Sequence, residues 1–351
     1  MSNLVEILFN ISTEFVLITG NEGYKQFKNE CRFKVYDVSY KIGNPFLKVI
    51  RNLSGQIIAS FIIIKNRKII KHWIFFGGER EIISIITAKL LKKNVIILIL
   101  GSVIRDYTIA KDPFTIIIKI LSTLKNALAD KLIVYTPRLI SEWHLEPYSH
   151  KILIASQNFL DFNTFTITIP LINRPHLIGY IGRFSAEKGV QNFVQALPAI
   201  FREQKEIKVL IGGDGQLKES VETSIKDSGL TDYVELSCWI SHDELPLHLN
   251  QLRLLVLPSY TEGLPNIMLE AMACGTPVLA TPVGAIPDVI IDGKTGFIMK
   301  DNSPECIAEN VIRALDCPDL ARIAENGRNS VRENYSFEKT VGRWKQIFNN
   351  I

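Results

Sequence analysis

The chain of 351 residues has few cysteines, and their spacing matches no disulfide framework. The five cysteines stand at positions 31, 238, 274, 306 and 317, and none forms a C-x-x-C pair. We therefore expect reduced thiols in a cytosolic protein, and neither disulfides nor a cysteine metal site. The sequence also contains no solenoid repeat, which excludes the common repeat architectures.

Long apolar runs are absent as well, although the chain is apolar on average. Hydrophobic residues make up 47% of it and the mean hydropathy is +0.14. No run of about 18 apolar residues occurs, so we predict no transmembrane helix. The first ten residues, MSNLVEILFN, place no basic region ahead of an apolar one, so we expect no signal peptide.

The net charge of +4 is unevenly shared along the chain. Residues 1–170 hold 22 lysines and arginines against 13 acids, a balance of +9, and the remaining residues carry −5. A basic, isoleucine-rich first half indicates an anionic partner, either a membrane surface or a phosphorylated lipid. The alternative is a lysine-rich surface that only aids solubility. We expect a cytoplasmic protein with no nucleic-acid partner. Peripheral attachment to the inner face of the cell membrane is a further hypothesis.

Short apolar runs alternate with amphipathic segments in two blocks, from Phe15 to Ile154 and from His176 onward. The stretch between them, TFTITIPLINRP at 164–175, has no helical pattern and two prolines, so we interpret it as a linker. The length suggests two domains. The pattern predicts an α/β fold with two doubly wound parallel sheets, one domain over 1–168 and another over 169–340.

Two segments of the first block, Pro45–Phe61 and Pro113–Asp130, are basic and amphipathic. Helices of this kind can lie on a membrane or pack on a sheet, and for the second segment we favour packing. The turn at Gly77 and Gly78 follows a predicted strand and could admit a ligand, or simply make a tight bend.

The stretch from Pro258 to Pro287 gives the strongest indication of a ligand site. An apolar run at 252–257 predicts a buried parallel strand, and the loop after it holds Glu262 and Gly263. Pro265 suits the first position of a helix, and Gly275 is placed to end that helix in a left-handed turn. Ligands of open parallel sheets bind at the carboxyl ends of strands, and free N–H groups at a helix start bind anions.

Glu262 on the loop and Glu270 on the predicted helix would then flank a bound phosphate. Carboxylates accept strong hydrogen bonds from sugar hydroxyls, so the pair could hold a sugar on each side of that phosphate. The alternative is that both are ordinary solvated glutamates.

A second stretch, GYIGRFSAEKG at 179–189, follows another predicted strand. Gly182 and Arg183 fall where that strand ends, and Ser185 is a candidate N-cap with Lys188 three residues on. A lysine in a first helical turn opposes the helix dipole unless an anion is bound. Arg183 and Lys188 thus form a candidate two-cation clamp for a diphosphate. The alternative is that Lys188 pairs with a nearby acid.

These motifs resemble glycosyltransferase family 4: GRFSAEKG, then GGDG at 212–215, then PSYTEGLPNIMLEAMACGTPVLAT and GAIPDVI. The resemblance is dense from residue 176 to 351 and looser over 70–160. It implies a GT-B fold, in which two Rossmann-like domains face each other across a cleft. It also implies transfer of a hexose-like sugar from a nucleotide-sugar with retention of configuration, and a final helix, residues 341–351, that crosses back to the first domain.

The resemblance assigns roles to particular residues. Glu262 and Glu270 match the E-x7-E motif, in which the first glutamate is associated with the donor sugar and the second with the ribose. Arg183 and Lys188 match the basic pair on the donor diphosphate, and with Glu262 they are the expected catalytic groups. The remaining expected donor-binding residues are Gly182, Gly213, Trp239, Ile240, Gly263, Leu264, Pro265 and Asn266.

The first block departs from the family pattern. Many members end a strand there with a histidine and a glycine, but Leu100 stands where that histidine would be. We take Gly77, Gly78 and Ser102 as weak acceptor-side candidates. The sequence has no Asp-x-Asp motif, so we expect no metal and no cofactor. Partners would be a UDP-, GDP- or ADP-linked sugar and a lipid-linked or cell-envelope acceptor. Two alternatives stay open: an inactive nucleotide-binding subunit and a nucleotide-sugar epimerase.

Overall fold

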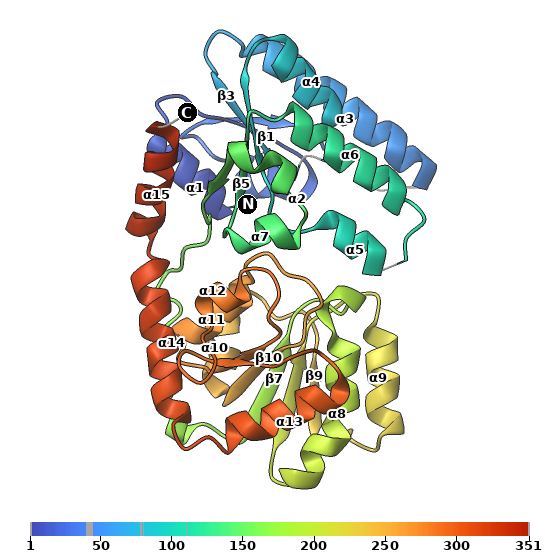
Figure 1. The fold of residues 1–351 in the computed structure, drawn as a ribbon, viewed down its shortest axis with the longest axis vertical. Helices are drawn as coiled ribbons and strands as arrows, with labels where there is room; N and C mark the ends of the chain where they lie inside the picture. The colour runs from blue at the N-terminus through green and yellow to red at the C-terminus, as the bar shows by residue number, and fades with distance from the viewer. Residues whose placement is uncertain (1, 40–44, 78, 80, 110, 350–351) are drawn as a thin grey trace. The chain divides into compact units, whose positions relative to one another are not determined.

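A computed structural model describes residues 2–39, 45–77, 79, 81–109 and 111–349 (Figure 1). The chain divides into two compact units, one of residues 1–158 with 340–351 and one of residues 159–339. The first unit therefore ends before the predicted boundary at 168. Among the described residues, no helix is both long enough and apolar enough to cross a membrane.

The first unit alternates helices and strands. In chain order its elements are α1 (Ser2–Ile11), β1 (Val16–Thr19), α2 (Asn21–Phe27), β2 (Lys34–Asp37), α3 (Pro45–Lys65), β3 (His72–Phe76), α4 (Ile82–Leu90), β4 (Asn94–Leu98), α5 (Val103–Ile109), α6 (Thr115–Leu128), β5 (Lys131–Val134), α7 (Arg138–Glu142) and β6 (Ile152–Ile154). Strands β3, β4, β5 and β6 form a parallel sheet in that order, and β1 pairs with β2 in a separate two-stranded parallel sheet. The helices α1, α2 and α5 were not predicted from the sequence, because each has ten residues or fewer and offers little periodicity to detect.

The second unit is a six-stranded parallel sheet with helices packed on it. Its elements are β7 (Leu177–Ile181), α8 (Val190–Glu203), β8 (Lys208–Gly212), α9 (Lys218–Asp227), β9 (Val234–Ser237), α10 (Leu245–Gln251), β10 (Leu254–Leu257), α11 (Asn266–Ala273), β11 (Val278–Ala280), α12 (Ile286–Val289), β12 (Phe297–Ile298), α13 (Pro304–Leu315) and α14 (Leu320–Asn334). The apolar faces of β7, β8 and β10 meet those of α8 and α13 in one buried core that includes Phe193, Val209 and Val311.

The sheet order in the second unit is β12-β11-β10-β7-β8-β9. The chain starts in the middle at β7, moves outward to β9, and then returns to build the other half from β10 to β12. This reversal is the doubly wound topology, and it leaves a crevice between β7 and β10 at their carboxyl ends. The predicted α/β class with parallel sheets is confirmed.

The last helix, α15 (Phe337–Asn349), passes from the second unit into the first at Thr340. Within the first unit, the indole of Trp344 is fully buried, donates a hydrogen bond to the Ser156 carbonyl (2.8 Å) and stacks on Phe348. The Thr340 hydroxyl donates to the Asn158 carbonyl (3.2 Å). These contacts anchor the end of the chain. The predicted final helix, residues 341–351, corresponds to α15, which begins earlier, at Phe337, and whose predicted residues 350 and 351 lie outside the described part of the chain.

Candidate functional site

The site is built where the strand order of the second unit reverses. The loops that follow β7 and β10 meet there, because these two strands are neighbours whose connections leave in opposite directions. The amide of Tyr260 in one loop donates to the Glu187 carbonyl in the other (2.9 Å). Gly189 has a left-handed φ of +69°, and a Cβ there would lie 2.0 Å from the Pro258 carbonyl oxygen. The approach of the loops therefore requires glycine at 189.

A third loop, the GGDG turn after β8, closes on the same point. Gly213 has a φ of +144°, and a Cβ on it would lie 1.9 Å from the Gly182 carbonyl oxygen. The Gly182 amide itself donates to the Gly212 carbonyl (3.0 Å). The close approach of these two backbones therefore requires glycine at 213, and Gly182 stays partly exposed at the end of β7.

A cavity of about 250 Å³ lies at this junction. Its lining comes from the end of β7, the end of β10 and the start of α11, and consists of Tyr180, Ile181, Gly182, Lys188, Leu257, Ser259, Glu262, Pro265, Asn266 and Ile267. Five predicted site residues, Gly182, Lys188, Glu262, Pro265 and Asn266, therefore line one cavity.

Lys188 and Glu262 form the polar centre of this cavity. The Lys188 Nζ lies 2.7 Å from Glu262 Oε1, and the Ser259 hydroxyl donates to the same oxygen (2.7 Å). Glu262 is buried, whereas Lys188 remains partly accessible. Without a ligand, Lys188 thus pairs with an acid, as the alternative interpretation of the sequence had it. That acid is the predicted sugar-binding glutamate, so the pair also brings the two predicted groups together.

Glu270 projects from the second turn of α11 and is 6% exposed. Burial raises the pKa of its carboxyl, and the imidazole of His242, whose Nε2 lies 3.4 Å from Oε1, acts in the opposite direction. The His242 ring packs edge-on against Phe165, with centroids 5.2 Å apart. His242 was not predicted as a site residue, because nothing in the sequence near residue 242 indicates a contact with Glu270, 28 positions further along the chain.

Arg183 and Trp239 extend outward from the junction. Arg183 is 70% exposed at its side chain, with Nη1 3.7 Å from Glu187 Oε1. Trp239 is 76% exposed, and neighbouring Ile240 lies against Gly212, where a Cβ would meet its Cδ1 at 2.5 Å. None of these three lines the cavity around Lys188. Both Arg183 and Trp239 are free to close on a ligand that extends beyond it.

The helix starts differ from the predictions by small shifts. Ser185 caps no helix: its hydroxyl donates to Glu187 Oε1 (2.6 Å), residues 186–188 form a 3₁₀ turn, and α8 begins after Gly189. Pro265 precedes α11 in extended conformation, so Asn266 is the first helical residue. The predicted left-handed end at Gly275 is confirmed, with φ +69°.

The loop before α11 is held in place by contacts with the segment after β11. Leu264 is buried, and the Gly263 carbonyl accepts a hydrogen bond from the Ala285 amide (2.8 Å). Gly284, with φ +61°, passes so close that a Cβ would lie 2.3 Å from the Glu262 carbonyl oxygen. Glu262 is therefore held on a rigid backbone, as a preorganised binding group requires.

The weak acceptor-side candidates belong to the first unit. Gly77 follows β3 with φ +82°, and its carbonyl accepts a hydrogen bond from the buried Lys125. Ser102 precedes α5, and its hydroxyl accepts a hydrogen bond from the Arg105 amide (3.3 Å). Gly78 lies outside the described residues. In the described part of the chain, no group of three or more His, Cys, Asp or Glu side chains is arranged to hold a metal ion.

Comparison with known proteins finds similarity to glycosyltransferases. Residues 165–330 match the family model "Glycosyl transferases group 1". Alpha-D-kanosaminyltransferase of Streptomyces kanamyceticus is 31% identical over 204 residues, which cover 56% of this chain and 53% of that one. The capsular polysaccharide biosynthesis glycosyltransferase CapM of Staphylococcus aureus is 30% identical over 188 residues, covering 52% and 48%. The chain spans about half the length of these curated relatives.

The fold is similar over the whole chain to a solved GT-B structure. Anabaena Alr3699/HepE in complex with UDP superposes with a TM-score of 0.79 and 14% identity, and the alignment covers 100% of this chain and 96% of that one. At this identity the likeness establishes the fold alone.

Proposed function

We propose that this protein, whose residues 165–330 match the family model "Glycosyl transferases group 1", moves a sugar from a nucleotide-sugar donor to an acceptor. The observation that carries the proposal is the meeting of Lys188 with Glu262 at the sheet's reversal point. A cation, a buried carboxylate and the start of α11 share one cavity there. This combination suits a ligand that joins a phosphate to a sugar.

The diphosphate would lie between Lys188 and the amino end of α11. On binding, the Lys188 ammonium exchanges the Glu262 carboxylate for a phosphate oxygen, and the exposed Arg183 swings in to supply a second cation. The free N–H groups of the first turn of α11 add partial positive charge. Gly263, buried in the loop before α11, adds no side chain on that side.

The two glutamates would bind the donor sugar and the ribose. Glu262, released from Lys188, accepts hydrogen bonds from hydroxyls of the donor sugar. Glu270 accepts from the ribose hydroxyls, because helical side chains lean toward the helix's amino end, where the phosphate lies. Trp239 and Ile240 offer apolar surface to the nucleobase, near the turn that contains Gly213.

Transfer with retention of configuration would need no protein nucleophile. The bond between the anomeric carbon and the diphosphate oxygen breaks, and the acceptor oxygen bonds to the same carbon from the same face. The acceptor's proton passes to the departing diphosphate. The protein's contribution is positioning together with stabilisation of the negative charge on the leaving group by Lys188, Arg183 and α11.

The acceptor would be a lipid-linked or cell-envelope glycan. Support comes from the basic first half of the chain and from the similarity to a capsular polysaccharide glycosyltransferase. UDP is the nucleotide to test first, since it is bound in the Anabaena structure of the same fold. An epimerase would instead turn over donor with no acceptor present, and an inactive subunit would bind donor without turnover.

We expect transfer to proceed without a divalent metal. In the proposed complex, Lys188, the incoming Arg183 and the start of α11 neutralise the leaving diphosphate, and the sequence has no Asp-x-Asp motif to hold a metal. Initial rates measured in excess chelator should match those measured with added Mg²⁺ or Mn²⁺. Loss of activity in chelator that is restored by either ion would contradict this part of the proposal.

A further inference from the structure

Helix α3 turns its apolar side to solvent. The outward residues Leu53, Ile57, Ile58, Phe61 and Ile64 recur at helical spacing, and Phe61 is 67% exposed. The buried side carries polar Gln56 and Ser60 beside Ala59 and Ile63. An ordinary surface helix has the opposite arrangement.

The buried polar residues of α3 are paired with α4. The Gln56 side-chain oxygen accepts a hydrogen bond from the Ile83 amide (2.9 Å), and the Ser84 hydroxyl donates to the Gln56 carbonyl (3.2 Å). The Thr87 hydroxyl donates to the Ser60 hydroxyl (3.1 Å). This polar seam fixes the rotation of α3, so its apolar side points away from the unit's core.

The neighbouring helices extend the same apolar surface. Helices α3, α4 and α6 lie side by side in that order (Figure 1). Helix α4 exposes Ile83, Ile86 and Leu90, and α6 exposes Ile116, Ile117, Ile120 and Leu124. On α6, too, polar residues are buried: Ser122 and Asn126, together with Lys125, whose ammonium contacts Glu79. We call the outward residues of these three helices the apolar face. Contiguous exposed apolar surface of this kind marks an interaction site.

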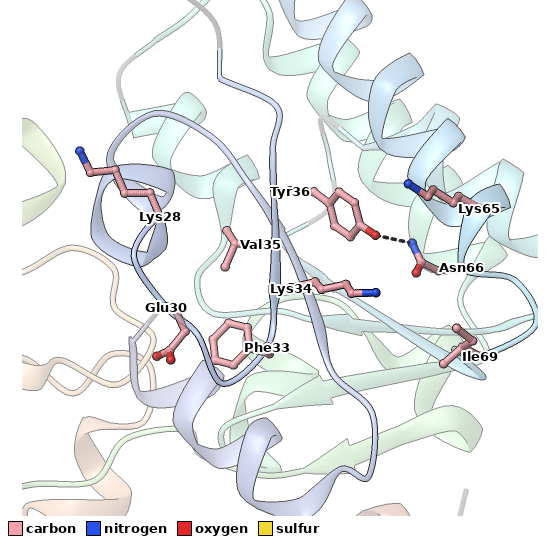
Figure 2. A pocket seen from close by; sticks show the side chains of 9 residues that line it. All are labelled: Lys28, Glu30, Phe33, Lys34, Val35, Tyr36, Lys65, Asn66 and Ile69. Atoms are coloured by element: carbon pink, nitrogen blue, oxygen red, sulfur yellow. Dashed lines mark hydrogen bonds between the residues drawn. The ribbon is translucent and has the colours of Figure 1, made fainter.

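A lysine pocket lies at the carboxyl end of α3 (Figure 2). Lys28, Lys34 and Lys65 surround it, the Asn66 side-chain amide donates to the Tyr36 hydroxyl (3.4 Å), and the exposed Ile69 forms part of its wall. Lys65 continues the row of Ile57 and Phe61 at spacings of four residues, so the pocket adjoins the apolar face. Glu30, the one acid in the lining, is held by Arg32 (2.8 Å).

We propose that the apolar face and the lysine pocket together dock the first unit on an anionic membrane. The isoleucine, leucine and phenylalanine side chains of the apolar face enter the boundary between headgroups and acyl chains. The lysine pocket takes the phosphate of a lipid headgroup.

The charge of the residues around the apolar face indicates which partner binds it. Exposed cations border the apolar face at Lys65, Arg67, Lys68, Lys92, Lys111 and Lys119. Such a basic rim matches anionic headgroups, and the apolar residues within it match the acyl boundary. A second copy of this chain would place the same cations against each other.

Co-sedimentation of the full-length protein with vesicles tests the proposal. We expect binding to vesicles of phosphatidylcholine with one quarter phosphatidylglycerol, and weaker binding to phosphatidylcholine alone. Ile57→Asp with Phe61→Asp should lower vesicle binding tenfold or more. Lys28→Gln, Lys34→Gln and Lys65→Gln together should lower binding to the anionic vesicles by about a hundredfold, since each lysine near such a surface contributes about fivefold.

Matched controls lie in the second unit. Ile172→Asp with Leu247→Asp changes two exposed apolar residues. The set Lys205→Gln, Lys208→Gln and Lys226→Gln removes three exposed lysines. Both control sets should bind vesicles like the unmodified protein.

The proposal is overturned if the test and control variants bind equally. It is also overturned if no vesicle binding occurs and Ile57→Asp with Phe61→Asp instead disrupts a dimer in sedimentation velocity. Vesicle binding is measured without nucleotide, so its result does not depend on whether the proposed sugar transfer is correct.

Discussion

Lys188→Ala is expected to lower kcat by roughly 30- to 1,000-fold. The ammonium would face the diphosphate as negative charge develops on it, and losing a charge-assisted contact of this kind raises the barrier by roughly 2–4 kcal/mol. The interaction strengthens in the transition state, so kcat should fall more than the nucleotide's affinity does. Steady-state kinetics with donor and acceptor, beside calorimetry with the nucleotide, separates the two effects.

In the Lys188→Ala variant, Glu262 loses the ammonium group that pairs with it, so a control variant is needed for this loss. The Ser259 hydroxyl still donates to Glu262, and Lys188→Gln restores a second donor without the charge. Lys188→Gln should therefore fold like the unmodified enzyme and remain slow. Lys205→Ala, at an exposed lysine of the same unit, should keep full kcat. A Lys188→Ala enzyme with unchanged kcat would remove Lys188 from the chemistry.

Glu270→Gln is expected to stabilise the free protein and weaken nucleotide binding. Burial raises the pKa of the Glu270 carboxyl, so its ionised form destabilises the folded state. Removing that charge should raise the free energy of unfolding at neutral pH by about 1 kcal/mol. For a unit of this size the melting temperature would rise by roughly 2–4 °C. The nucleotide should bind more weakly, because a neutral amide is a poorer acceptor for ribose hydroxyls than a carboxylate.

The pH dependence gives this prediction a distinct signature. The folded-state pKa of Glu270 lies above its unfolded value, so protonated Glu270 favours the folded state. The favourable contribution is complete below the unfolded pKa and is lost as the pH rises through the folded pKa. The stability gained by Glu270→Gln should thus grow as the pH rises through that interval. Denaturant unfolding across the acidic range measures it, with exposed Glu235→Gln as control. A gain that is independent of pH would contradict the assignment.

The second unit was largely predictable from the sequence because its signals are local. Most of its strands are short apolar runs, α8, α9 and α11 begin after glycine-containing loops, and Gly275 marks a left-handed end. The positions of Lys188, Glu262 and Glu270 follow from parallel strands, whose carboxyl ends meet at one edge. The pairing of Lys188 with Glu262 had been considered only as contact with an unnamed acid.

Other features depend on contacts between distant segments and were not predictable. His242 meets Glu270 only through the packing of the second unit. The need for glycine at 189 and 213 comes from backbones that converge from separate loops. In α3, periodicity revealed an apolar face but not its direction. That direction is set by Gln56 and Ser60, whose partners lie on α4.

The central claim is that the cavity around Lys188 and Glu262, with Glu270 on its helix, holds a nucleotide diphosphate. Calorimetric titration of the purified protein with UDP, GDP and ADP in chelator, beside Glu270→Ala, tests it most directly. We expect one of the three to bind in the micromolar range, and Glu270→Ala to weaken it tenfold or more, about 1.4 kcal/mol. Absence of binding by all three to the folded protein, or equal binding by Glu270→Ala, would contradict the claim.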